Sequence, residues 1–258
     1  MPKRLSLASP QARYLLSALL ILALGGCQTM SLEDVTGALG SKSEPVANAD
    51  ARPDMDALRE RYRAKPSDAN IALDYGKALR ETGQRAQAVA VLEQAVLAHP
   101  SNKALLAGYG RALSDNGNFQ QAYDVLSRAH TPEDPDWRIL SAQGAALDQL
   151  GRNDEAQQYY ATALKIVPDE PQVLSNLGLS YALQNNLPRA EETMRRAYER
   201  NAANPRVRAN LALVLGLEGK LAEAETIVKA DLPPDQAAAK VTALRQLLAK
   251  KQQQRAEK

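Results

Sequence analysis

The chain has 258 residues, of which 45% are hydrophobic, 24% charged and only 4% aromatic, and its formal net charge is +2. A single Cys excludes an intrachain disulfide, so stability must come from packing. One Phe, one Trp and few β-branched runs, beside abundant Ala and Leu, predict an all-α chain.

Residues 1–27 are predicted to be an export signal. An apolar run at 15–24 is too short to span a bilayer and follows three basic residues, Lys3, Arg4 and Arg13. The ending Leu24-Gly25-Gly26-Cys27 resembles the bacterial lipobox, which implies a lipoprotein signal peptide with Cys27 as the acylated residue. The alternatives are an ordinary secretory signal with an incidental Cys and a cytosolic protein with an apolar N-terminus. Removal of the signal leaves 29 basic against 30 acidic residues, so nucleic acid is not expected as a partner.

Residues 28–52 are rich in Ser, Gly, Ala and Asp, which predicts a flexible tether between lipid and fold. In the lipoproteins that this lipobox resembles, an Asp directly after the Cys holds the protein at the inner membrane. Here that residue is Gln28, and the resemblance therefore implies an anchor in the outer membrane with the fold in the periplasm.

A 34-residue period begins after a short predicted N-terminal capping helix at 53–68. Five central small residues mark the period: Gly76, Gly110, Gly144, Gly178 and Ala212. Seven residues after each lies Gly or Asn, which tolerates a left-handed backbone and so predicts the end of a first helix: Gly83, Gly117, Gly151, Asn185 and Gly219. Twelve residues after each lies an Ala, and sixteen after each a bulky apolar residue: Leu92, Leu126, Tyr160, Met194 and Val228. We expect the small residues to allow close helix approach and the bulky ones to fill the space between successive helix pairs.

This pattern resembles the tetratricopeptide repeat, a pair of antiparallel helices per 34 residues. The resemblance implies an all-α, right-handed superhelical solenoid with capping helices. Its five units are 69–102, 103–136, 137–170, 171–204 and 205–238. The period is followed by a predicted C-terminal capping helix and polar tail at 239–258, in which Val241, Leu244, Leu247 and Leu248 recur at helical spacing.

In the fold that this resembles, one side of every first helix lines a concave groove. By register, the early units place charged residues of mixed sign there, among them Lys77, Arg80, Arg111 and Asp115. The last two units supply the candidate peptide-binding face: Asn176, Leu179, Leu183, Asn210, Leu213 and Leu217. Two alternatives stay open, because the Asn residues could only brace neighbouring helices and the Leu residues could be covered by the C-terminal cap.

Catalytic and metal sites find no support in the sequence. His99 and His130 are expected near the ends of second helices, with no nucleophile or metal-ligand set beside them. We therefore predict neither an enzyme nor a bound cofactor or metal.

Three stretches resemble the TadD family, the tetratricopeptide-repeat lipoproteins of the tight-adherence (Flp) pilus system. They are residues 136–148, residues 171–196 and the ending Ala230-Asp231-Leu232-Pro233-Pro234 with Ala237-Ala238-Ala239. The resemblance implies a part in pilus assembly, with the outer-membrane secretin or other pilus components as partners.

The periodicity itself predicts only a scaffold that binds protein segments. The alternative role is an adaptor or regulator of cell-wall enzymes or of outer-membrane protein assembly.

Overall fold

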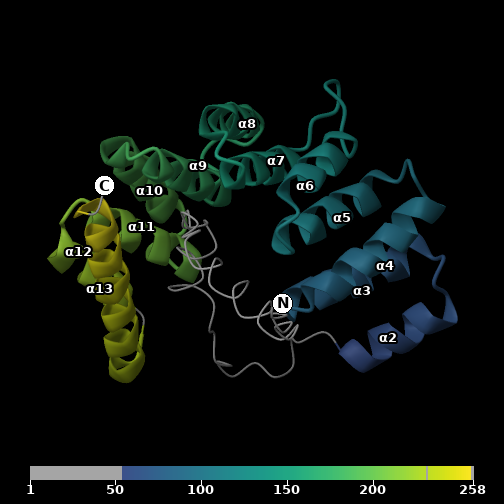
Figure 1. The fold of residues 1–258 in the computed structure, drawn as a ribbon, viewed down its shortest axis with the longest axis horizontal. Helices are drawn as coiled ribbons and strands as arrows, with labels where there is room; N and C mark the ends of the chain where they lie inside the picture. The colour runs from purple at the N-terminus through teal and green to yellow at the C-terminus, as the bar shows by residue number, and fades with distance from the viewer. Residues whose placement is uncertain (1–53, 231, 257–258) are drawn as a thin grey trace, which may run out of the picture. The chain divides into compact units, whose positions relative to one another are not determined.

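The computed structural model describes residues 54–230 and 232–256, which all belong to one compact unit, Ser31–Lys258. The predicted signal peptide, Cys27 and the tether lie outside the described residues. Within these residues all the regular elements are helices (Figure 1). The helices are α2 (Met55–Ala64), α3 (Ala69–Glu81), α4 (Arg85–Ala98), α5 (Lys103–Asp115), α6 (Phe119–Ser127), α7 (Trp137–Gln149), α8 (Asn153–Ile166), α9 (Pro171–Leu183), α10 (Leu187–Arg200), α11 (Pro205–Leu217), α12 (Leu221–Lys229) and α13 (Pro234–Ala256).

The helices pack as a solenoid. Each helix contacts the next along the chain, and each first helix also contacts the first helix of the following pair, from α3 with α5 to α11 with α13. The pairs are α3/α4, α5/α6, α7/α8, α9/α10 and α11/α12, with α2 before the first and α13 after the last. The predicted all-α repeat solenoid with capping helices is confirmed.

Each first helix begins at a capping residue that also recurs every 34 positions. Its side-chain oxygen accepts a hydrogen bond from a backbone N–H in the first turn, which satisfies a donor that has no partner within the helix. These caps are Asp68, Asn102, Asp136, Glu170 and Asn204. The cap therefore fixes where each unit starts, just as the turn residue fixes where its first helix ends.

The turn between the helices of each pair has the predicted left-handed residue. Gly83, Gly117, Gly151 and Gly219 have φ between 75° and 85°, and Asn185 has φ 61°. Backbone with positive φ strains most side chains, so Gly and Asn at this place allow the chain to reverse within a few residues.

The helical glycines are explained by contacts within each pair. A Cβ at Gly144 would lie 2.7 Å from the ring of Tyr160, and a Cβ at Gly76 would lie 2.5 Å from Leu92. The same conflict exists between Gly110 and Leu126 and between Gly178 and Met194. The bulky residue of the second helix thus lies directly over the glycine of its own first helix. Leu92 also reaches the next pair, since a Cβ at Gly108 would lie 3.7 Å from its Cδ2, so the contact over the central glycine adds to the predicted packing between successive pairs.

Two second helices are shorter than the others, and both end near prolines. The α6 and α12 helices have nine residues each, whereas α4, α8 and α10 have 14. The last helix begins at Pro234, inside the range assigned to the fifth unit, and not at residue 239 as predicted. Proline suits the first turn of a helix, where its missing N–H would have no partner, so Pro234 is well placed as the first residue of α13.

Both ends of the described solenoid carry a packed helix. Met55, Leu58 and Tyr62 of α2 pack against the first core cluster, and the Tyr62 ring lies 5.3 Å from that of Tyr75. At the other end the Leu248 side chain of α13 meets the Gly216 surface of α11. No described helix combines the length and the apolar character that crossing a membrane requires.

Candidate binding groove

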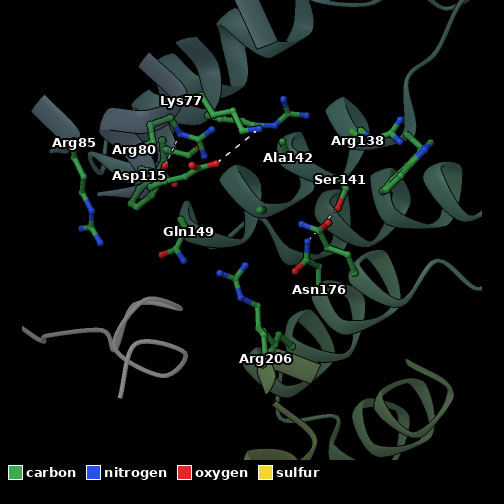
Figure 2. Close-up of a pocket in the computed structure, with 18 of the residues that line it drawn as sticks. Lys77, Arg80, Arg85, Asp115, Arg138, Ser141, Ala142, Gln149, Asn176 and Arg206 are labelled. Atoms are coloured by element: carbon green, nitrogen blue, oxygen red, sulfur yellow. Dashed lines mark hydrogen bonds and ion pairs between the residues drawn. The ribbon is translucent and has the colours of Figure 1, made fainter. Parts of the chain in front are cut away.

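A groove of about 930 Å³ runs along the first helices from α3 to α11 (Figure 2). We call this surface the groove. Phe119 and Arg85, from the starts of α6 and α4, join the first-helix residues that line it. Because successive first helices pack side by side, residues 34 positions apart are presented to the same surface.

The residue directly after the central small residue shows how the groove changes along the solenoid. In the five units this residue is Lys77, Arg111, Ala145, Leu179 and Leu213. The first four line the groove. At this one position the lining residue changes from charged to apolar, but the other lining residues of α9 and α11 are polar: Gln172, Asn176, Arg206 and Asn210.

The predicted apolar stripe does not form as a continuous surface. Leu179 lines the groove but is only 3% exposed, and Leu213 is 1% exposed and is not part of the lining. Leu217 is partly buried, while Leu183 is 37% exposed but does not belong to the groove lining. Of the four Leu side chains of the candidate face, Leu179 and Leu213 are therefore buried and only Leu183 is exposed. Since α13 packs on α11, the interpretation that the C-terminal cap covers the end of this face fits the structure better.

The two predicted Asn residues brace adjacent first helices. Asn176 Nδ2 donates to Ser141 Oγ at 3.1 Å, and one unit later Asn210 Nδ2 donates to Ser175 Oγ at 2.9 Å. Asn210 is 3% exposed, so most of its side chain is unavailable to a ligand. Both residues touch the groove, but their amide groups already hold the solenoid together.

Basic side chains dominate the polar lining of the groove. Six basic residues face two acidic ones: Lys77, Arg80, Arg85, Arg111, Arg138 and Arg206 against Glu81 and Asp115. Arg80 Nε lies 2.6 Å from Asp115 Oδ2, and Lys77 Nζ lies 3.9 Å from Glu81 Oε1. Both acids are thus matched by a cation within the groove, which leaves an excess of positive charge.

Arg111 lies where positive charges gather. Burial lowers the pKa of its guanidinium most, the nearby charges of Arg80 and, less strongly, Arg138 lower it further, and the carboxylates of Asp136 and Asp115 oppose these effects. A guanidinium still stays protonated at any physiological pH. The middle of the groove therefore holds a partly desolvated cation beside like charges.

The only Phe and the only Trp of the chain also lie in the lining. Phe119 and Trp137 are partly exposed, and the Arg138 guanidinium lies 4.4 Å from the centroid of the Trp137 ring. Partly exposed aromatic and Arg side chains are the residue types that contribute most to binding at protein interfaces. Sequence reasoning missed that the 34-residue register places Arg138 and Arg206 at equivalent positions.

The described residues hold no group of three or more His, Cys, Asp or Glu side chains that could bind a metal ion. His99 Nε2 lies 2.7 Å from the Ser67 carbonyl oxygen, and His130 Nε2 lies 2.9 Å from Gln143 Oε1. The α6 helix ends at Ser127, so His130 lies three residues after its last residue. Both histidines thus lie after the ends of second helices, and their imidazoles contact a backbone carbonyl and a glutamine side chain.

Comparison with known families identifies the repeats and the residues that they cover. Family models described as tetratricopeptide repeat match residues 79–144, 141–205 and 205–229. Among solved structures, the chain resembles the tetratricopeptide-repeat protein TTC0263 of Thermus thermophilus, with 21% identity and a TM-score of 0.61 over 69% of this chain and 99% of that one. It also resembles a tetratricopeptide-repeat protein of Parabacteroides merdae, with 16% identity and a TM-score of 0.60 over 77% of this chain and 78% of that one. No curated protein matches the chain.

Identities this low support the fold alone, but the family models cover consecutive units across most of the helical pairs. Repeats of this kind form protein–protein interaction scaffolds. The chain belongs to the tetratricopeptide-repeat family.

Proposed function

We propose that this protein is a lipid-anchored periplasmic scaffold that holds a segment of another envelope protein during assembly of a tight-adherence type pilus. The observation that carries the scaffold role is the groove, an extended surface that combines charged, amide and aromatic side chains. The resemblance of residues 136–148 and 171–196 to the TadD family supports the pilus and suggests the outer-membrane secretin as partner.

In this proposal Cys27 is acylated and Gln28 directs the anchor to the outer membrane. A Cys27→Ala variant is expected to lose membrane association and to leave the folded repeats in the soluble periplasm. Fractionation of cells followed by immunoblotting measures this. Unchanged recovery of the variant in the outer-membrane fraction would contradict the anchor.

The partner is tested by cross-linking in intact cells. Ala142 lines the groove and is partly buried, so a photoreactive amino acid at this position reaches a bound segment, and circular dichroism checks that the substituted protein remains folded. The matched control position is Leu97, which is 78% exposed and outside the groove lining. We expect position 142, but not position 97, to capture a secretin or another pilus component.

Deletion of the gene provides the second test. The proposal requires fewer secretin multimers and fewer surface pili in the deleted strain. If both are unchanged and position 142 captures a cell-wall enzyme or a barrel-assembly component instead, the pilus role is wrong and the adaptor role replaces it.

A further inference from the structure

We infer that the segment held in the groove is acidic and extended, with carboxylate side chains that pair with Arg111, Arg138 and Arg206. This inference rests on the proposed scaffold function and adds the chemistry of the ligand. Three observations support it: the excess of basic residues in the groove, the ion pairs that already occupy Glu81 and Asp115, and the amide and aromatic side chains that lie in the same lining.

The excess of positive charge is local to the groove. Six basic and two acidic residues line it, although the predicted mature chain has nearly equal numbers of each. The two acids are already paired with Arg80 and Lys77. Because basic and acidic residues are nearly balanced over the predicted mature chain, a surface of this size would be close to neutral on average. The positive lining therefore favours an anionic ligand.

The three arginines come from three different units, so they follow the length of the groove. Arg111 is on α5, Arg138 on α7 and Arg206 on α11, and Figure 2 shows Arg206 extended into the groove. Arg138 and Arg206 are separated by two repeat periods and therefore have the same register. A ligand that meets all three must be extended along the solenoid and carry several negative charges.

The neighbouring side chains favour a peptide over a nucleic acid. Gln149 and Gln172 line the same groove, and amide groups suit the backbone N–H and C=O of an extended peptide. Phe119 and Trp137 provide apolar surface for side chains between the carboxylates. Glu81 and Asp115 would repel a continuous phosphate backbone, whereas a peptide can place its carboxylates away from them.

Three blocked synthetic peptides test the inference with the purified full-length chain in detergent. One has Glu at every second position with Gly and Leu between, and in the other two Gln or Lys replaces every Glu. Blocked ends remove terminal charges, and fluorescein anisotropy measures binding. We expect the Glu peptide to bind about tenfold or more tightly than the Gln peptide, with loss of that preference at high salt.

The matched variants are Arg138→Gln with Arg206→Gln in the groove and Arg61→Gln with Arg63→Gln on exposed positions of α2. Both remove two positive charges, and circular dichroism checks that both remain folded. The groove pair is expected to weaken binding of the Glu peptide about tenfold, and the α2 pair to leave it within about twofold. Equal binding of the Glu and Gln peptides, or equal effects of the two variant pairs, overturns the inference.

Two further outcomes identify a different occupant. If the Glu peptide binds only after Glu33, Asp34, Glu44 and Asp50 are changed to Gln or Asn, the groove takes this chain's own N-terminal segment and the partner inference is wrong. Binding of a single-stranded oligonucleotide as tight as that of the Glu peptide also overturns it.

The cross-linking position separates this inference from the proposed function. If position 142 captures a pilus component equally well with and without the Arg138→Gln and Arg206→Gln changes, the scaffold role holds and the acidic ligand is wrong. If it captures no partner in cells while the Glu peptide still binds selectively in vitro, the ligand chemistry holds and the cellular role is wrong.

Discussion

Asp148 is a buried carboxyl group at the junction of three helices. It lies on α7 and is 6% exposed. Its Oδ1 accepts hydrogen bonds from Asn153 Nδ2 and Ser180 Oγ, each at 2.7 Å, and its Oδ2 accepts one from the Tyr160 hydroxyl at 2.9 Å. Burial raises the pKa of Asp148 from 3.8 to about 6, because desolvation outweighs these three hydrogen bonds, which lower it.

The direction of the pH effect follows from this shift. A carboxyl group whose pKa is higher in the folded state binds its proton more tightly there than in the unfolded chain. Its contribution to the free energy of unfolding is therefore largest below about pH 4, decreases between about pH 4 and pH 6, and is constant above about pH 6. With about 1.4 kcal/mol per pKa unit, the ionised group lowers stability at pH 7 by up to about 3 kcal/mol relative to the protonated group.

Asp148→Asn tests this contribution. The amide has the shape of the protonated carboxyl, keeps one acceptor oxygen and can donate to the Tyr160 hydroxyl in place of accepting from it. We expect the variant to be about 1–3 kcal/mol more stable than the wild type at pH 7 and nearly equal to it at about pH 4. Urea denaturation followed by circular dichroism at a series of pH values measures the difference.

An exposed acid provides the control, since Asp56→Asn on α2 changes the same charge at a side chain that is 87% exposed. This control is expected to give no gain in stability at neutral pH, because its carboxylate is exposed and pairs with Arg59. If the stability difference between Asp148→Asn and the wild type is the same in mild acid and at neutral pH, the assigned balance between desolvation and hydrogen bonding is wrong.

Two further pairs of variants test the packing of the repeats by thermal and urea unfolding. Gly144→Ala is expected to destabilise the protein by about 1–2 kcal/mol, because the new Cβ meets the rigid ring of Tyr160 and this overpacking exceeds the gain in helix propensity. Gly178→Ala meets a flexible methionine, so a smaller loss is expected, and equal losses would argue against ring packing as the cause. Leu213→Asp buries a carboxylate at a position that is 1% exposed and should cost more than about 3 kcal/mol, whereas Leu183→Asp at 37% exposure should cost less than about 1 kcal/mol. A tolerated Leu213→Asp would show that this position faces solvent after all.

Local residue chemistry was sufficient to predict the helical pairs. Gly83 and Asn185 can be recognised because a left-handed turn restricts the residue types that fit, and the central glycines because close helix contact restricts side-chain volume. These constraints act within one unit, so they recur at the repeat period and can be read without knowledge of the neighbouring units. The capping residues, such as Asp68 and Asn102, carry the same kind of signal and were overlooked.

The candidate face was less predictable, because exposure depends on contacts between units. Register places Leu179 in the groove lining, but it does not reveal that the side chains of Leu179 and Leu213 are both buried. The same is true of Asn210, whose partner Ser175 lies on a different unit.

The sequence alone determined that this chain is an array of helix pairs. Few other folds place a small residue within a helix, and a residue that tolerates a left-handed backbone at its end, once every 34 positions. Only the tertiary structure decided that the available surface is basic and aromatic. Burial, ion pairing and the accumulation of charge around Arg111 are sums over several helices, and no single repeat contains the information to fix them.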